Sequence, residues 1–260
     1  MVSVVIPYHN SSRTIKQTLY SVACQTYRDV EVIIIDDMSK PDERAELVAG
    51  CNDTYPFPLR IIKSDDRLGA AGARNLGVRE ASGEYIAFLD SDDFWEKDKL
   101  DKQIKVMERF RLEGEAPVIC FTGRRLVSSG GKYFDKTIGC DKIVDYDKLL
   151  LSNQINCSSV LIRKDTLEDV SFPDGKLHED YALWLSILKR GGYAAGINRP
   201  LLNYRLSPGS RSGNKLRSAI MTYRVYRFLG IPVLSSAGYM VSYTVRGIMK
   251  YLGLGRKCKA

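Results

Sequence analysis

Four apolar segments in the first ninety residues constrain the fold of this chain more than any other feature. They cover residues 2–7, 31–35, 59–63 and 85–89, and valine and isoleucine dominate them. A strand with one face in water alternates apolar and polar side chains, whereas these runs largely lack that alternation. A polar turn and a stretch with helical spacing follow each run, which is typical of parallel strands covered by helices on both faces. We therefore predict an α/β fold.

Helices are predicted between and after these strands. Ser12, Pro41 and Gly69 stand near the expected helix starts. From Lys99 onward apolar residues recur every three or four positions, and another short helix is predicted after Asp180. Further strands are predicted at residues 118–121, 159–162, 193–197 and 201–204.

The composition fits one large folded domain. The chain has 260 residues, of which 44% are hydrophobic and 27% charged, and this excludes disordered and fibrous classes. Its six cysteines show no paired spacing, so we expect reduced thiols and a cytosolic protein. The N-terminus enters an apolar strand without a basic segment or cleavage signature, so no signal peptide is expected. Two histidines in the whole chain exclude a histidine-rich metal site.

Two acidic clusters follow predicted strands at equivalent positions. Asp36 and Asp37 end one strand, and residues 90–93, with the sequence Asp-Ser-Asp-Asp, end another. Ligands of an open parallel sheet bind beyond the carboxyl ends of its strands, so both clusters are expected at one site. So many carboxylates repel one another unless a cation compensates them, and a hard divalent metal with phosphate oxygens is a suitable complement. A nucleoside diphosphate site is indicated, although aspartate also occurs at simple turns and helix starts.

Three longer segments resemble a known family. They are VSVVIPYHNSSRTIKQTLYSVACQTYRDVEVIIIDDMS, GARNLGVREASGEYIAFLDSDDFW and HEDYALWLSILKRGG. Together they are similar to family 2 glycosyltransferases, over about residues 2 to 215, and most of all to non-processive bacterial members that build teichuronic acid, capsule and lipopolysaccharide O-chains. The resemblance implies the A-type nucleotide-diphospho-sugar transferase fold, with a mainly parallel sheet flanked by helices. We expect this catalytic domain over residues 1–213 and basic amphipathic helices over residues 214–260.

The resemblance also implies residue roles around the donor. Asp37 corresponds to the family's acceptor of the uracil imide N–H, which implies a UDP-sugar or a dTDP-sugar, because a carboxylate can only accept. Asp92 is the expected ligand of a divalent metal, Mn or Mg. The other residues implied around the nucleotide are Pro7, Tyr8, Asn10, Arg74, Asp90 and Ser91. For Tyr8 a half-buried structural role stays open, and for Arg74 a surface pair with Glu80 or Asp66 does.

Asp180 corresponds to the family's catalytic base. Inversion at the anomeric carbon is a single displacement, which needs one base for the acceptor hydroxyl and a group that stabilises the departing UDP. The helix N-terminus at Asp180 is expected to favour its ionised form, and a plain helix cap is the alternative. Residues implied near the diphosphate or acceptor are Glu179, Arg211 and Lys215. His178 is expected to be an exposed loop residue, and the QxxRW signature of processive synthases is absent.

The last eighty residues are strongly basic. No Asp or Glu follows Asp180, whereas residues 181–260 contain 14 Lys and Arg. Apolar residues at helical spacing begin at Leu216, and residues 228–245 carry no charge but include Gly230 and Pro232, which makes them marginal as a membrane span. We predict docking on an anionic membrane surface, with packing on the catalytic domain or on a second subunit as the alternative. Nucleic acid binding is not expected, because no recognised motif accompanies the charge.

The sequence thus predicts an inverting, metal-dependent transferase that moves one sugar from a UDP-sugar to a lipid-linked saccharide at the inner face of the cytoplasmic membrane. A haloacid-dehalogenase-type phosphatase is the main rival enzyme, since FLDSDDF also fits a strand that ends in a nucleophilic aspartate. That motif normally follows the first strand, which here ends in Pro-Tyr-His-Asn. A nicotinamide-binding fold lacks its glycine motif. A non-catalytic partner subunit of a polysaccharide assembly complex is the remaining alternative, and the oligomeric state stays open.

Overall fold

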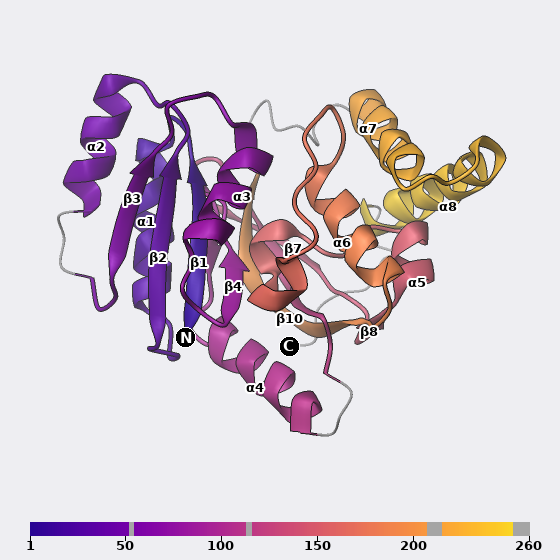
Figure 1. Ribbon diagram of the computed structural model, residues 1–260, viewed down its shortest axis with the longest axis horizontal. Helices are drawn as coiled ribbons and strands as arrows, with labels where there is room; N and C mark the ends of the chain where they lie inside the picture. Colours follow the sequence, from indigo (N-terminus) through magenta and orange to yellow (C-terminus); the bar gives the residue numbers. More distant parts are fainter. Residues whose placement is uncertain (52–54, 113–115, 207–214, 252–260) are drawn as a thin grey trace.

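The computed structural model describes residues 1–51, 55–112, 116–206 and 215–251, which form one mixed sheet with helices on both faces (Figure 1). The strands are β1 (Val2–Tyr8), β2 (Val30–Asp36), β3 (Leu59–Lys63), β4 (Tyr85–Phe88), β5 (Phe94–Trp95), β6 (Ile119–Ser128), β7 (Tyr133–Ile138), β8 (Ile143–Val144), β9 (Leu161–Arg163) and β10 (Ala194–Leu206). The helices are α1 (Ser12–Ala23), α2 (Pro41–Cys51), α3 (Gly69–Glu80), α4 (Lys99–Leu112), α5 (Tyr146–Leu151), α6 (Glu179–Lys189), α7 (Lys215–Phe228) and α8 (Val233–Tyr251), with 3-10 turns at Cys157–Ser159 and Lys164–Leu167.

The sheet confirms the predicted fold class. Its strands run in the order β3-β2-β1-β4-β9-β6-β10-β5, and the four strands that were predicted first form a parallel block. Strand β9 is antiparallel to both of its neighbours, β4 and β6, and β10 returns parallel to β6. The sheet is therefore mixed but mostly parallel.

One strand prediction was wrong. The two pieces expected at residues 193–197 and 201–204 belong to the single strand β10. The strand continues because its pairing with β6 shifts register on either side of Pro200, which has no N–H to donate.

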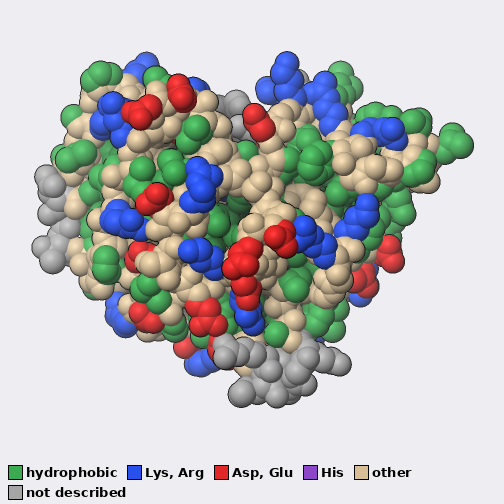
Figure 2. Space-filling model, viewed as in Figure 1, with side chains coloured by type: hydrophobic (Ala, Val, Ile, Leu, Met, Phe, Trp, Pro, Cys, Tyr) green, Lys and Arg blue, Asp and Glu red, His purple; other side chains and the backbone are tan. Residues whose placement is uncertain are grey.

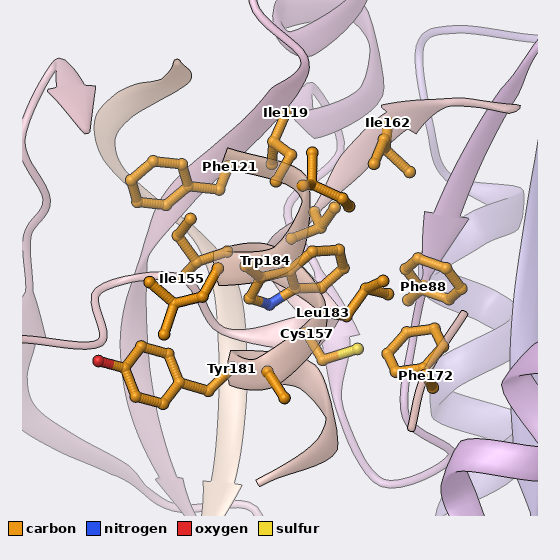
Figure 3. Packing of buried hydrophobic residues seen from close by; sticks show 14 of the residues in the cluster. Phe88, Ile119, Phe121, Ile155, Cys157, Ile162, Phe172, Tyr181, Leu183 and Trp184 are labelled. Carbon is orange, nitrogen blue, oxygen red and sulfur yellow. The ribbon is translucent and has the colours of Figure 1, made fainter. Parts of the chain in front are cut away.

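Alternate side chains of the central strands face two separate cores. Val5, Ile33 and Phe88 pack on one side of the sheet beneath α3 and α6, and Val4 and Ile34 pack on the other side against α1 and α4. Figure 3 shows the first core, in which Trp184 of α6 lies among Phe88, Phe172 and Ile155. Because both faces are covered, the strands can be apolar along their whole length.

The C-terminal helices α7 and α8 pack on the rest of the fold through tyrosines. The ring centroid of Tyr181, on α6, lies 6.3 Å from that of Tyr226 on α7 and 5.9 Å from that of Tyr243 on α8. The Tyr226 hydroxyl donates to the carbonyl oxygen of Leu150 at 2.8 Å. This agrees with packing on the domain, the alternative left open for this region. The outer face of α8 is exposed and apolar, with Val241 66% exposed.

The uncharged run at residues 228–245 is not one helix. It is divided between α7 and α8 by a turn in which Gly230 has a φ of +78° and Pro232 follows. In the described part of the chain, no helix combines the length and the apolar character needed to cross a membrane.

The close contact between α3 and β1 gives a stability prediction. A Cβ atom on Gly77 would lie 2.3 Å from Cγ1 of Val5, so Gly77→Ala forces the helix and strand apart. We expect a loss of about 1–3 kcal/mol in the free energy of unfolding, measured by urea denaturation. The matched control is Gly238→Ala on α8, where nothing lies within 4 Å, and it should be neutral or stabilising by up to about 1 kcal/mol. Equal effects of the two changes would contradict this account.

Candidate active site

A cleft of about 970 Å³ opens at the carboxyl ends of the parallel strands. It brings together most of the residues that the sequence predicts for the site, from segments far apart in the chain: Pro7, Tyr8, Asp37, Arg74, Asp90, Ser91, Asp92, Glu179 and Asp180. Helices α7 and α8 line the same cleft with Ser218, Met240 and Tyr243 among others. Arg211 and the side chain of Lys215 lie outside the described residues.

Asp36 and Asp37 have different surroundings, because successive side chains at the end of a strand point in opposite directions. Asp36 is buried, accepts from the Ser39 N–H at 3.0 Å and pairs with Arg44. Asp37 lines the cleft, and its carboxylate accepts the backbone N–H groups of Leu68 at 2.6 Å and Gly69 at 3.0 Å. The start of α3 thus fixes Asp37 at the cleft wall.

Tyr8 and Asn10 act mainly in the scaffold. Tyr8 is 1% exposed and its hydroxyl donates to the Glu43 carbonyl at 3.0 Å, while burial raises its pKa to about 12. Asn10 is not among the residues that line the cleft, and its predicted nucleotide contact stays a prediction. Its backbone adopts a φ of +50°, and its side-chain oxygen accepts from the Lys40 N–H at 2.9 Å, so it holds the loops after β1 and β2 together.

The Asp-Ser-Asp-Asp turn at residues 90–93 is held from both sides. The Thr18 hydroxyl lies 3.1 Å from the carbonyl oxygen of Ser91 and 2.8 Å from that of Asp93. On the other side, the buried Arg205 donates through Nε to the Asp92 carbonyl at 2.8 Å, and its backbone N–H donates to Asp93 at 2.9 Å. Burial, with Asp92 and Asp90 nearby, raises the pKa of Asp93 well above its usual range.

Arg74 joins the two acidic parts of the site. Its side chain is 6% exposed and donates to Asp90 at 2.6 Å and to Glu179 at 3.3 Å. Its guanidinium also lies 5.4 Å from the ring centroid of Phe172. Neither Glu80 nor Asp66 is its partner, so the surface pair considered from the sequence is wrong.

Asp180 stands at the start of α6, within the cleft. One of its carboxylate oxygens accepts from the Tyr181 N–H at 2.7 Å. Burial and then the neighbouring charge of Glu179 raise its pKa, against the opposing effects of His178 and Arg74. The N–H of Tyr181 at the helix start favours the ionised form, as predicted, but burial and Glu179 outweigh it. His178 is half-buried, and its Nε2 lies 3.1 Å from the Ser218 hydroxyl of α7, so it is not a free loop residue either.

The donor set suits a divalent metal that a substrate helps to hold. Among the described residues no group of three or more His, Cys, Asp or Glu is placed to bind a metal alone. Asp92 and Asp90 nevertheless supply carboxylates at one turn of the cleft wall. Mg²⁺ commonly takes one or two carboxylates and completes its shell with phosphate oxygens and water. The residues present fit such a site.

Several residues that line the cleft or support its wall were missed from the sequence. Arg205 follows an ordinary strand pattern, and nothing local marks its role because its partners are more than 70 positions away. His9 and Arg67 line the cleft beside Asp37, and Arg124 and Asn156 line it from the irregular second half. The only available signal was the general one that cleft residues follow strand ends, and this does not distinguish individual positions.

Comparison with known proteins identifies the family. Residues 3–164 match the family model described as "Glycosyl transferase family 2". The chain belongs to this family. It is 35% identical, over 97% of its length and 98% of the relative's, to a "Putative teichuronic acid biosynthesis glycosyltransferase TuaG" of Bacillus subtilis. It is 33% identical, over 96% of its length and 95% of the relative's, to "UDP-Glc:alpha-D-GlcNAc-diphosphoundecaprenol beta-1,3-glucosyltransferase WfaP" of Escherichia coli.

Two solved structures share the fold. S. aureus TarS 1–349 in complex with UDP-GlcNAc superposes with a TM-score of 0.70 at 18% identity, over 98% of this chain and 73% of that one. Mannosyltransferase PcManGT from Pyrobaculum calidifontis, in complex with GDP-Man and Mn²⁺, gives 0.67 at 18% identity, over 92% and 69%. The predicted A-type glycosyltransferase fold is thereby confirmed.

Removal of Arg74 tests its place between the carboxylates. In Arg74→Met the partly buried Asp90 and Glu179 lose their countercharge, and we expect a loss of about 3 kcal/mol in the free energy of unfolding at pH 7.5. Part of that loss should return as the pH falls, because protonated carboxyls need no countercharge. Arg79→Met, an exposed position on the same helix, should change stability by no more than about 0.5 kcal/mol. Urea unfolding from pH 5 to 8 measures both, and a pH-independent difference would count against the bridge.

Proposed function

We propose that this family 2 glycosyltransferase moves a single sugar from a UDP-sugar, with inversion, to a hydroxyl group of a lipid-linked saccharide in cell-surface polysaccharide biosynthesis. One observation carries the proposal. The cleft joins the Asp37 wall, the Asp90–Asp92 turn and Asp180, which are the three parts that such a transfer requires. The family provides the reaction class, and the relatives named above provide the setting.

The donor end of the cleft is proposed to be the Asp37 side. Asp37 retains lone pairs beyond those used by Leu68 and Gly69, so it can accept the imide N–H of uracil, which cytosine does not offer. A dTDP-sugar presents the same imide. The neighbour TarS is described in complex with UDP-GlcNAc, and the relative WfaP is named for UDP-Glc, which agrees with a uridine donor.

Asp180 is proposed as the base that accepts the proton of the attacking hydroxyl. Its raised pKa makes it a stronger base than an ordinary aspartate. The acceptor oxygen then forms a bond to the anomeric carbon, and the bond from that carbon to the UDP oxygen breaks. Arg74 keeps Glu179 and Asp90 from repelling the carboxylate of Asp180 further.

Asp92, with Asp90 beside it, would hold the divalent metal, Mn or Mg. Bound there, the metal would supply positive charge to the diphosphate that leaves. The neighbour PcManGT is described with Mn²⁺.

The acceptor and the membrane are proposed to approach along α7 and α8. In Figure 2 hydrophobic, Lys and Arg side chains gather at the upper right, over these helices. Among the exposed ones are Leu234 at 87%, Val241 at 66% and Val245 at 51% on α8, with Arg217 and Arg224 exposed on α7. An amphipathic, basic surface of this kind suits the anionic inner face of the cytoplasmic membrane, as a peripheral location requires.

Nucleotide selectivity provides the first functional prediction. UDP with Mn²⁺ should raise the melting temperature more than GDP or CDP does, because a ligand that binds only the native state stabilises it by about 2.7 kcal/mol at a hundredfold excess over Kd. Asp92→Asn should remove most of the increment that Mn²⁺ adds and leave the metal-free effect of UDP. If no nucleotide shifts the melting temperature, the non-catalytic partner subunit becomes the better description.

Substitution of the proposed base separates chemistry from binding. Asp180→Asn should lower transfer by about a thousandfold, since general bases contribute about 10²–10⁴, and leave the Kd for UDP within twofold. It should also raise the melting temperature at pH 7.5, because a carboxyl whose folded pKa is raised costs stability above that pKa. Asp169→Asn, at an exposed position 81% open to solvent, is the control. A parallel loss of UDP binding would argue against Asp180 as the base.

The raised pKa of Asp180 also predicts a pH profile. Asp180 works only when ionised, so kcat/KM should fall as the pH decreases through its folded pKa. Burial and Glu179 raise that pKa, so the acid limb should lie above about pH 4, the range of an ordinary aspartate. The profile from pH 4 to 9 measures it, and a limb at the ordinary value would contradict the burial of the base.

A further inference from the structure

Among the described residues, three arginines line the cleft, and they have different partners. Arg67 pairs with Asp37, and Arg74 pairs with Asp90 and Glu179. Arg124, in contrast, contacts no carboxylate among the residues that the structure describes. Its guanidinium lies 5.8 Å from the ring centroid of Tyr204, and its Nε atom, like that of Arg74, is buried without a hydrogen-bond partner. Unlike Arg74, it has no carboxylate of a described residue on its other nitrogen atoms.

A guanidinium in this setting requires an anion. Arginine keeps its charge at every pH relevant to a protein, so it cannot relieve burial by losing a proton. A buried donor of a charged group that lacks an acceptor is costly, and proteins rarely keep one without a purpose. The fork of N–H groups fits two oxygens of a phosphate or a carboxylate at once.

The position of Arg124 indicates whether it faces the donor nucleotide or the acceptor. It lies on β6, opposite Ile138 of β7 and Leu202 of β10. Strands β4 and β9 separate β6 from β1, whose end leads to the proposed nucleotide side. The cleft residues near it in sequence or pairing, Leu126, Ile138 and Tyr204, belong to the second half of the chain.

We propose that Arg124 binds an anionic group of the acceptor, namely the phosphate that links the receiving saccharide to its lipid. This inference rests on the proposed function and adds to it the residue that recognises the acceptor's charge. The donor diphosphate is placed instead at the Asp90–Asp92 turn, where a metal would compensate it.

Arg125 offers a matched control on the same strand. It lies 5.4 Å from the ring centroid of Tyr133, so it also stacks on a tyrosine, but it does not line the cleft. Arg124→Gln and Arg125→Gln therefore remove the same charge from neighbouring positions and differ in access to the substrate.

The test is equilibrium binding of dodecyl diphosphate to protein saturated with UDP and Mn²⁺, with dodecyl glucoside as the uncharged probe. Arg124→Gln should weaken dodecyl diphosphate binding by about tenfold or more, which corresponds to one charged hydrogen bond, and leave dodecyl glucoside unchanged. Arg125→Gln should stay within twofold of the unmodified protein for both probes. The Kd for UDP should be unaffected by either change.

Three results would overturn the inference. The first is no binding of dodecyl diphosphate to the unmodified protein, and the second is an equal effect of the two substitutions. The third is a tenfold loss of UDP affinity in Arg124→Gln, which would assign this arginine to the donor diphosphate. Failure of the proposed function is distinguishable, because it shows as an absence of UDP binding in the unmodified protein.

Discussion

The site depends on the ion pairs of Arg74. Asp90 and Glu179 lie 16 and 105 positions from it in the sequence, on the turn after β4 and at the start of α6. Without a cation between them these two carboxylates would repel each other, so the segments that carry them could not pack side by side. One buried guanidinium thereby fixes the distance between the Asp90–Asp92 turn and the start of α6. The acidic turn of the first half and the start of α6 in the second half become one site through this contact.

Two further sets of contacts hold the same parts from outside. Arg205 donates hydrogen bonds to the carbonyl oxygen of Asp92 and to those of Ser128 and Ser129. It thereby connects the end of β10, the end of β6 and the acidic turn. Behind the base, the tyrosines of α6, α7 and α8 pack against one another. The C-terminal helices are therefore part of the wall next to Asp180 as well as an exposed surface.

The sequence predicted the parallel block and its acidic strand ends well, because both rest on local signals. Val4 and Val5 face different cores, yet both are apolar, and this alone marks a strand covered on two sides. Asp37 and Asp180 were found from motifs. Arg205 and the partners of Arg74 were not, because they depend on contacts between distant segments that leave no periodic trace. The two pieces predicted at residues 193–197 and 201–204 proved to be one strand, because register shifts on either side of Pro200 let the pairing with β6 continue.

The distribution of charge in the cleft suggests that its arginines have different roles. Arg67 and Arg74 are neutralised by the protein's own carboxylates, so they shape the site before any substrate arrives. Arg124 lies beside the ring of Tyr204 and contacts no carboxylate among the described residues, so its charge is left for a ligand. A protein that pairs two cleft arginines with its own carboxylates and leaves a third, partly buried one without such a pair bears the cost of that third one in the free state. Substrate binding recovers this cost, which couples recognition of the acceptor to completion of the site.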